Sequence, residues 1–284
     1  MLPEAARIWP APAKINLFLH IVGRRPDGYH LIQTVFQFVE LHDELRFTPR
    51  ADGHIRLQTP LPGVPPQQDL CVRAAQALRA HTGCRLGVDI ELTKRIPMGG
   101  GLGGGSSDAA TTLLALSRLW ALDLPRTELV AIGLALGADV PVFIGGRAAW
   151  AEGIGELLTP IDLDEPWYLI IDPGVAVATA SVFGHPKLTR HTLPITISGF
   201  RSGPTGNDCL AVVRELYPQV GAAYRWLAGF GQAHLSGTGG CLFARIDRKQ
   251  AADAALAQLP APWRGWVVRG RNCHPLLADP LPSK

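Results

Sequence analysis

A glycine-rich stretch, Pro-Met-Gly-Gly-Gly-Leu-Gly-Gly-Gly-Ser-Ser-Asp at residues 97–108, constrains the fold of this chain more than any other feature. Before it, residues 88–93 alternate between apolar and polar side chains, which predicts a half-buried strand. After it, residues 109–120 carry apolar side chains at helical spacing, so Ser106 or Ser107 is expected to cap a helix there. The chain is therefore predicted to run from a strand through a tight loop into a helix.

This strand, loop and helix start predict an anion site. Glycine lets the backbone turn tightly and bring its N–H groups close to a ligand, because no Cβ intervenes. The helix start adds unpaired N–H groups and a partial positive charge, which Asp108 is expected to complement. A phosphate chain is the natural occupant. A flexible hinge is the weaker alternative, because both flanks are regular and two serines lie where phosphates would bind.

Other known glycine loops fit this stretch poorly. Gly99, Gly101 and Gly104 satisfy the dinucleotide-binding pattern, but a run so rich in glycine matches it almost automatically. That pattern also needs an acidic residue about 20 positions on, and the nearest, Asp123, stands just before Pro125 at a predicted helix end. No lysine follows the glycines, as a Walker loop requires, and the chain lacks the His-Arg-Asp and Asp-Phe-Gly motifs of protein kinases.

The composition of the chain limits its class and its partners. It has 284 residues, 47% of them hydrophobic, which supports a packed core. The net charge of +3 is too small to indicate a nucleic-acid or membrane partner. No apolar run is long enough for a bilayer and no signal-peptide pattern opens the chain. Five scattered cysteines without a Cys-x-x-Cys pair favour free thiols in a reducing cytoplasm. They are Cys71, Cys84, Cys209, Cys241 and Cys273.

The N-terminal part is expected to open with a β-hairpin. Residues 13–21 alternate, which predicts a strand with one buried face, and residues 29–39 return after an Arg-Pro-Asp-Gly turn. On spacing alone, Lys14 is an ordinary solvated lysine of that strand. Tyr29 and His30 follow the turn, where they can meet a ligand or serve only in edge-strand packing.

Further elements are predicted between this hairpin and the glycine loop. Residues 45–47 and 55–57 indicate two short strands. Asp69 is expected to cap a helix that runs to about Ala80, with Gly83 as its stop.

A helix after Pro125 is predicted to end at the segment 137–141, which contains a single aspartate. Pro141 disfavours helical backbone at Val140, so Asp139 is expected on a forced turn. Its carboxylate stands alone in an apolar stretch. Spacing leaves two readings open, a helix-stop residue bonded to local backbone and a functional group.

The C-terminal part reads as short strands and helices in mixed order. The expected elements are a strand at 167–171, a short helix at 178–183, a loop at 193–206, a helix capped by Asn207 or Asp208 and reaching Tyr217, a glycine turn at 235–243 between two strands, a helix at 247–259, a strand at 266–268 and a loose tail from Pro275.

Five stretches together resemble the GHMP kinases, the superfamily of galactose, homoserine, mevalonate and phosphomevalonate kinases. They are residues 12–19, 25–30, 97–107, 136–143 and 235–243, in the order of that superfamily. The Asp-Gly-Tyr-His turn within residues 25–30 is similar to that of one member family, the 4-diphosphocytidyl-2-C-methyl-D-erythritol kinases of the non-mevalonate isoprenoid route.

The resemblance implies roles for single residues. The family's catalytic lysine and aspartate fall on Lys14 and Asp139. Its ATP segment falls on Pro97, Met98, Gly99, Gly100, Gly101, Leu102, Gly103, Gly104, Gly105, Ser106 and Ser107. Its substrate site is implied at Asn16, Tyr29, His30, Lys94 and Phe183, of which Lys94 and Phe183 match only by position. Many members have Asn in place of Asp108, whose carboxylate should repel phosphates unless it serves the helix start or a metal ion.

The resemblance also implies the reaction. ATP is the expected phosphoryl donor, with Mg²⁺ carried on it, and the 2-hydroxyl of 4-diphosphocytidyl-2-C-methyl-D-erythritol is the acceptor. Asp139 would take the hydroxyl proton, and Lys14 would offset charge that develops on the γ-phosphate. The partner is thus a small cytidine diphosphate sugar alcohol, with no nucleic acid and no membrane. The protein is expected to be a cytoplasmic monomer or homodimer.

The implied fold is α+β in two halves, with the active site in the cleft between them. The halves are predicted at residues 1–150 and 151–284. The mixed order of elements speaks against a simple alternating βαβ sheet. Three alternatives remain: a homoserine or mevalonate type of kinase, a non-catalytic nucleotide-sensing module on the same fold, which should lack Lys14 or Asp139, and a nicotinamide enzyme.

Overall fold

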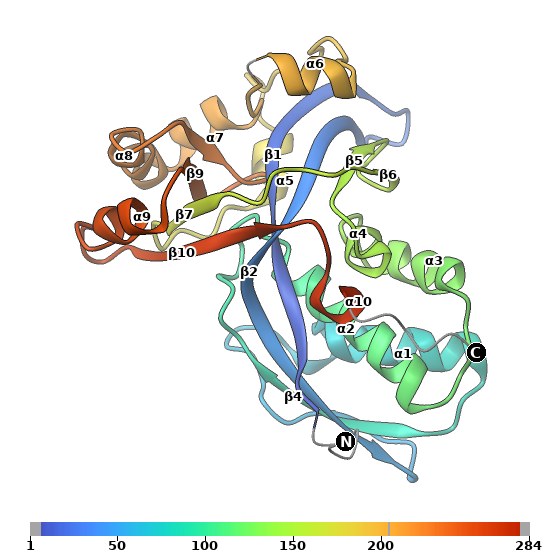
Figure 1. Ribbon diagram of the computed structural model, residues 1–284. Coiled ribbons are helices and arrows are strands. Elements are labelled where there is room, and N and C mark those ends of the chain that lie inside the picture. Colours follow the sequence, from blue (N-terminus) through green and yellow to red (C-terminus); the bar gives the residue numbers. More distant parts are fainter. Residues whose placement is uncertain (1–6, 204, 279–284) are drawn as a thin grey trace.

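One long β-hairpin organises the fold. The computed structural model describes residues 7–203 and 205–278, and in it β1 (Trp9–Arg24) and β2 (His30–Arg50) pair antiparallel along nearly their whole length (Figure 1). The predicted turn joins them. The separate strand expected at residues 45–47 is wrong, because β2 continues unbroken through them and pairs there with β4.

A ten-stranded mixed sheet grows from this hairpin. Its path runs β3-β4-β2-β10-β7-β9-β8, with β1 and β5 also paired to β2 and β6 paired to β5. All these pairs are antiparallel except β3 with β4. The remaining strands are β3 (Ile55–Leu57), β4 (Gly87–Thr93), β5 (Ala149–Glu152), β6 (Leu157–Pro160), β7 (Trp167–Asp172), β8 (Ala233–Leu235), β9 (Leu242–Ile246) and β10 (Arg264–Arg271).

The helices form two groups at the two ends of the sheet (Figure 1). The first group is α1 (Leu70–Thr82), α2 (Gly104–Leu119), α3 (Arg126–Leu136) and α4 (Val140–Gly145). The second is α5 (Thr179–Phe183), α6 (Ile197–Ser202), α7 (Leu210–Leu216), α8 (Pro218–Leu227) and α9 (Lys249–Leu256). The short α10 (Pro275–Ala278) returns to the first group, and a 3-10 turn covers Pro66–Gln68.

Each helix group encloses its own hydrophobic core. The first core fills the space between α1–α4 and the β1, β2 and β4 strands, and the second lies among α7–α9 and the β7, β8 and β9 strands. A third cluster, which includes Ile15 and Ile170, joins them across the sheet. The α+β fold in two halves is thus confirmed. The predicted division at residue 150 falls inside β5 and remains a prediction.

Several predictions based on local chemistry are confirmed. Asp69 caps α1 by accepting hydrogen bonds from the backbone N–H groups of Cys71 and Val72, and Gly83 ends that helix in the left-handed conformation. The glycine turn at 235–243 joins β8 to β9 as expected. The strands at 167–171 and 266–268 are the interiors of β7 and β10, and the helix at 178–183 is α5.

Other local predictions are wrong. Neither Ser106 nor Ser107 caps α2: the helix begins earlier, with Gly103 as a cap in the left-handed conformation. Pro141 does not force Val140 out of a helix, because both belong to the first turn of α4, where a proline needs no backbone donor.

Three more expectations fail in the C-terminal part and in β1. The predicted loop at 193–206 contains α6, and residues 275–278 form α10, while the tail beyond 278 lies outside the described residues. β1 is buried on both faces, so Lys14 is not solvated.

Over the described ranges, we find no helix whose length and apolarity would let it span a membrane.

Candidate active site

Lys14 and Asp139 form an ion pair at the centre of the molecule. Lys14 Nζ lies 3.3 Å from Asp139 Oδ2. Lys14 is buried in the middle of β1, whereas the side chain of Asp139, at the start of α4, is 35% exposed. A fixed cation thus stands beside a carboxylate that a ligand can reach.

Two further acceptors fix the Lys14 ammonium. Nζ donates to Asn16 Oδ1 at 2.6 Å and to the backbone carbonyl of Gly101 at 3.0 Å. Asn16 is itself held, since its Nδ2 donates to Thr34 Oγ1 at 2.9 Å. Two hydrogen bonds and the ion pair with Asp139 thus hold the Lys14 ammonium against the glycine loop.

The glycine loop is packed tightly enough to need its glycines. Gly101 and Gly103 have φ of +74° and +71°, in the left-handed region that favours glycine. A Cβ on Gly101 would lie 2.1 Å from the backbone oxygen of Ser236, and one on Gly103 would lie 2.9 Å from Phe143. Ser236 Oγ also donates to the Gly101 carbonyl at 2.9 Å. The loop is therefore a rigid ridge and not a hinge.

This ridge separates two cavities. One, of about 540 Å³, is lined by the loop from Pro97 to Ser106 together with residues of α1 and the segment before it. The other, of about 340 Å³, is lined by Lys14, Asn16, Asp139 and Phe183. Both share Gly99, Gly101, Gly103, Ser106 and Thr179 as walls. The two cavities therefore border each other along the glycine loop and Thr179, and the Lys14–Asp139 pair lies on the wall of the smaller one.

The described residues contain no group of three His, Cys, Asp or Glu side chains that could hold a metal ion. A phosphate-bound Mg²⁺ would enter with its nucleotide and belongs to the substrate.

Comparisons with known proteins agree with this geometry. The family models for the N-terminal and C-terminal domains of GHMP kinases match residues 69–147 and 200–265. The chain is 57% identical to a 4-diphosphocytidyl-2-C-methyl-D-erythritol kinase of Nitrosococcus oceani, over 96% of this chain and 98% of that protein. It is 56% identical to the kinase of the same name of Alkalilimnicola ehrlichii, over 96% and 94%. The chain belongs to the 4-diphosphocytidyl-2-C-methyl-D-erythritol kinase family of GHMP kinases.

Solved structures give the same assignment. A crystal structure of 4-(cytidine 5'-diphospho)-2C-methyl-D-erythritol kinase matches with a TM-score of 0.81 and 33% identity, over 93% of this chain and 99% of that one. A mevalonate kinase structure matches with a TM-score of 0.69 at 16% identity, over 94% and 100%, and shows the shared fold alone.

The structure brings His30 and Phe183 together in this GHMP kinase. Their rings stack with centroids 4.8 Å apart and an interplanar angle of 18°. Phe183 lines the smaller cavity, while Tyr29, at the tip of the hairpin, is 60% exposed. Burial, with Arg190 and Arg24 nearby, lowers the pKa of His30, so its ring is neutral at pH 7.

Arg190 is the functional candidate that sequence reasoning missed. Its Nε donates to His30 Nε2 at 3.1 Å, and its other nitrogens donate to the backbone carbonyls of Phe183, His185 and Leu188. Since Nε2 accepts, the ring proton of neutral His30 is on Nδ1. Arg190 lies in a loop far along the chain, and no local motif pointed to it.

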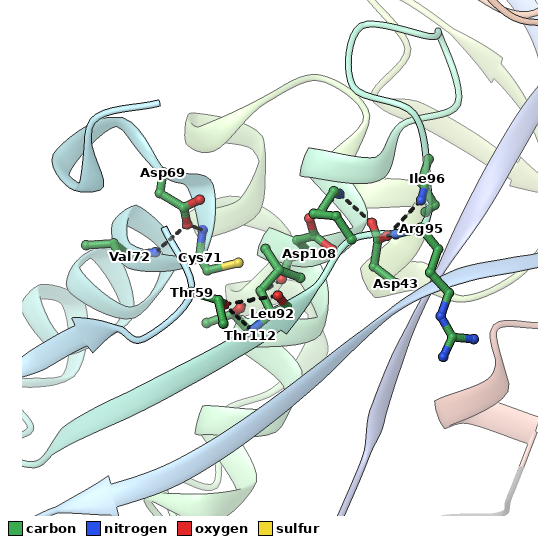
Figure 2. A network of polar contacts seen from close by, with 11 residues as sticks. Asp43, Thr59, Asp69, Cys71, Val72, Leu92, Arg95, Ile96, Asp108 and Thr112 are labelled. Carbon is green, nitrogen blue, oxygen red and sulfur yellow. Dashed lines mark hydrogen bonds and ion pairs between the residues drawn. The ribbon is translucent and has the colours of Figure 1, made fainter. Parts of the chain in front are cut away.

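Two predicted site residues lie elsewhere than expected. Lys94, predicted with the substrate residues, lines the larger cavity and pairs with Asp43 and Asp108. Figure 2 labels these two carboxylates. The structure does not bring Lys94 to His30 or Phe183. Ser107, predicted with the phosphates, is fully buried inside α2, and only Ser106 of the two serines lines the cavities. Asp108 is also buried and does not complement the helix start from outside.

Proposed function

We propose that this chain is an ATP-dependent kinase that phosphorylates the 2-hydroxyl of 4-diphosphocytidyl-2-C-methyl-D-erythritol, a step of non-mevalonate isoprenoid precursor synthesis. One observation carries the proposal. A glycine loop divides a larger cavity, suited to MgATP, from a smaller one, and the Lys14–Asp139 pair lies where the two meet. Phosphoryl transfer needs a donor and an acceptor held in line, with developing charge neutralised, and this arrangement supplies both.

The reaction assigns one role to each member of the pair. Asp139 accepts the proton of the substrate 2-hydroxyl, whose oxygen forms a bond to the γ-phosphorus while the bond from that phosphorus to the β,γ-bridging oxygen breaks and ADP leaves. Lys14 offsets the charge on the transferring group, since its ammonium is already fixed by Asn16 and Gly101. Backbone N–H groups of the loop and the Mg²⁺ of the nucleotide neutralise the phosphates.

The cytidine end of the acceptor belongs at the His30–Phe183 stack. The Nδ1–H of His30 can donate to the carbonyl or ring nitrogen of cytosine, and an aromatic ring can cover the flat face of the base. Tyr29, exposed at the tip of the hairpin, is proposed as a further contact to the cytidine end, and Asn16 as a contact to the methylerythritol part. We place the reaction in the cytoplasm, because five free thiols fit a reducing compartment. Whether the enzyme is a monomer or a homodimer stays a prediction.

A panel of acceptor alcohols tests this function. ADP release from MgATP is measured with the cytidine diphosphate sugar alcohol, homoserine, mevalonate and galactose. Turnover is expected only with the first. Turnover with homoserine or mevalonate alone would show that the chain has another GHMP kinase activity. Binding of the nucleotide without turnover of any acceptor would indicate a sensing module.

A single substitution then tests the cytidine pocket. His30→Ala is expected to raise the KM for the cytidine substrate about tenfold to a hundredfold, since one lost hydrogen bond to a buried base costs roughly 1–3 kcal/mol. The KM for ATP should stay the same. His54→Ala, at an exposed histidine just before β3, is the matched control. Equal effects on both substrates would remove His30 from the pocket.

A further inference from the structure

Two buried carboxylates share one ammonium behind the wall of the larger cavity. Lys94 Nζ donates to Asp43 Oδ2 and to Asp108 Oδ2, the latter at 2.7 Å. The two carboxylate side chains are 0% and 3% exposed. Figure 2 shows Asp43 and Asp108 converging from β2 and α2. Two buried anions against one cation would leave an uncompensated charge in a site with little water.

The donors around each carboxylate show where this charge is removed. Asp43 is fully satisfied as an anion, because its Oδ1 accepts from the backbone N–H groups of Arg95 and Ile96 while Lys94 binds the other oxygen. Asp108 receives only Lys94, and its buried Oδ1 has no hydrogen-bond partner in the part of the chain that the structure describes. A buried charged oxygen without a donor is costly, whereas a protonated one carries no charge. The geometry therefore assigns a proton to Asp108 and none to Asp43.

The surrounding groups favour the same assignment. Burial raises the pKa of Asp108 most, the Lys94 cation lowers it, and the neighbouring Asp43 raises it again, to about 8. Cys71 of α1 also faces this cluster, and burial raises the pKa of its thiol well above the ordinary value, so that it adds no charge at neutral pH. Asp69, the cap of α1, is the remaining anion near Cys71.

The cluster borders the proposed nucleotide site. Lys94, Asp108, Cys71 and Asp69 all line the larger cavity with the glycine loop. A Cβ on Gly104 would lie 3.2 Å from Lys94 Nζ, so the ammonium touches the first residue of α2. With Asp108 protonated, Lys94 and Asp43 balance each other. With Asp108 ionised, the cluster carries one net negative charge beside the phosphates.

We propose that Asp108 is a positioning residue for the nucleotide and acts in its protonated form: it holds Lys94 against the glycine loop without adding negative charge there, and its ionisation at alkaline pH weakens MgATP binding. The nucleotide part of this inference rests on the proposed function, which places ATP in the larger cavity. The protonation of Asp108 does not rest on it.

Infrared spectroscopy tests the protonation without any activity. The wild-type protein should show a carbonyl band of a buried, protonated carboxyl group at pH 7 that disappears with a midpoint near pH 8. Asp108→Asn should lack this band. Its absence from the wild-type protein at pH 7, or its persistence in Asp108→Asn, would overturn the assignment.

Calorimetric titration with MgATP tests the consequence. The wild-type Kd should rise on the order of tenfold between pH 7 and pH 9, the effect of one unit charge about 10 Å from another at an effective dielectric constant near 20. The Kd of Asp108→Asn should be the same at both pH values, because an amide keeps the hydrogen bond from Lys94 but cannot ionise.

Asp89→Asn is the matched control for this titration. Asp89 also has a buried Oδ1 without a partner among the described residues, but its hydrogen bond from Arg50 lowers its pKa, so it holds no proton to lose. Asp89→Asn should keep the wild-type rise in Kd. An equal rise in Asp108→Asn and wild type would overturn the positioning role. A titrating carboxyl band in a protein that binds no MgATP at either pH would instead refute the nucleotide site and leave the protonation standing.

Discussion

Lys14 Nζ lies 3.3 Å from Asp139 Oδ2, and the same ammonium also donates to Asn16 and to the carbonyl of Gly101. Asn16, Gly101 and Asp139 all line the smaller cavity, and the Asp139 side chain is 35% exposed. The lysine is thus fixed by its neighbours, while the carboxylate beside it is accessible from the cavity.

Asp139→Asn is expected to lower kcat by about 10²- to 10⁴-fold, because the amide cannot accept the hydroxyl proton. The KM values for ATP and for the acceptor should change far less. Steady-state kinetics on both substrates make the measurement. A variant with near wild-type kcat would exclude Asp139 as the base.

Lys14→Met should behave differently from Asp139→Asn in stability. It leaves the buried Asn16 Oδ1 without its donor, while the Gly101 carbonyl keeps its hydrogen bond from Ser236 Oγ, and one unsatisfied buried acceptor costs about 1–3 kcal/mol. Urea unfolding should therefore show a clear loss of stability for Lys14→Met and little for Asp139→Asn, whose side chain is partly exposed. Equal stabilities would contradict the role of Lys14 as the anchor of the loop.

Gly103→Ala is expected to impair both nucleotide binding and chemistry. Gly103 has φ of +71°, and a Cβ there would lie 2.9 Å from Phe143 Cζ and 3.1 Å from Lys14 Cε. The variant must therefore displace Lys14 as well as strain the loop, so kcat should fall together with ATP affinity.

Gly145→Ala is the control for this change, because a Cβ at that position meets nothing within 4 Å. It should leave both constants as in the wild type. If Gly103→Ala raised the KM for ATP and left kcat unchanged, the contact between the loop and Lys14 would not contribute to kcat.

Local chemistry made part of this fold predictable. The cap at Asp69 and the stop at Gly83 are set by neighbours within four residues, so the sequence indicated them directly. The cap of α2 failed because Ser106 and Ser107 are suitable cap residues, yet contacts of the glycine loop with β1 and the 235–241 turn start the helix at Gly104.

The candidate site was also predictable only in part, because long-range contacts decide how its residues pair. Resemblance pointed to Lys14 and Asp139, but neither spacing nor composition could show that they touch. Lys94 was predicted beside the substrate, whereas its ammonium is drawn to two carboxylates from other elements. Arg190 had no local signal, since its partner His30 lies 160 positions away in the sequence. Long-range electrostatic pairs of this kind leave no periodic pattern in a sequence.

Arg190→Gln should make acceptor binding sensitive to pH. Burial lowers the pKa of His30 most, and the charges of Arg190 and Arg24 lower it further, so the substitution should move that pKa part of the way back toward 6.5. In the variant a growing share of His30 is protonated as the pH falls from about 7.5 to 5.5. The KM for the cytidine substrate should then change over that range, because the ring beside the base gains a charge, while the KM for ATP should not.

Arg190→Lys is the conservative control, because it keeps the charge but loses the planar fork that holds three carbonyls. It should raise the KM without the new pH dependence. Identical pH profiles for Arg190→Gln and the wild type would show that Arg190 does not tune His30.

His274 is expected to make the protein sensitive to acid. It is fully buried, its Nδ1 accepts the backbone N–H of Leu276 at 3.2 Å, and its ring packs edge-on against Phe38. Burial, with a smaller effect of Arg126, lowers its pKa to about 3. Below pH 6.5 the unfolded chain binds a proton at His274, whereas the folded protein does not. Protons therefore shift the equilibrium toward the unfolded state. The stability that neutral His274 contributes is thus present above pH 6.5 and is lost as the pH falls toward 3, by at most about 1.4 kcal/mol per pH unit.

The free energy of unfolding in urea, measured at pH 7, 6 and 5 for wild type and His274→Phe, should fall more steeply for the wild type. His54→Phe, at an exposed histidine, should keep the wild-type slope. Parallel curves for wild type and His274→Phe would mean that His274 gains its proton without unfolding the protein.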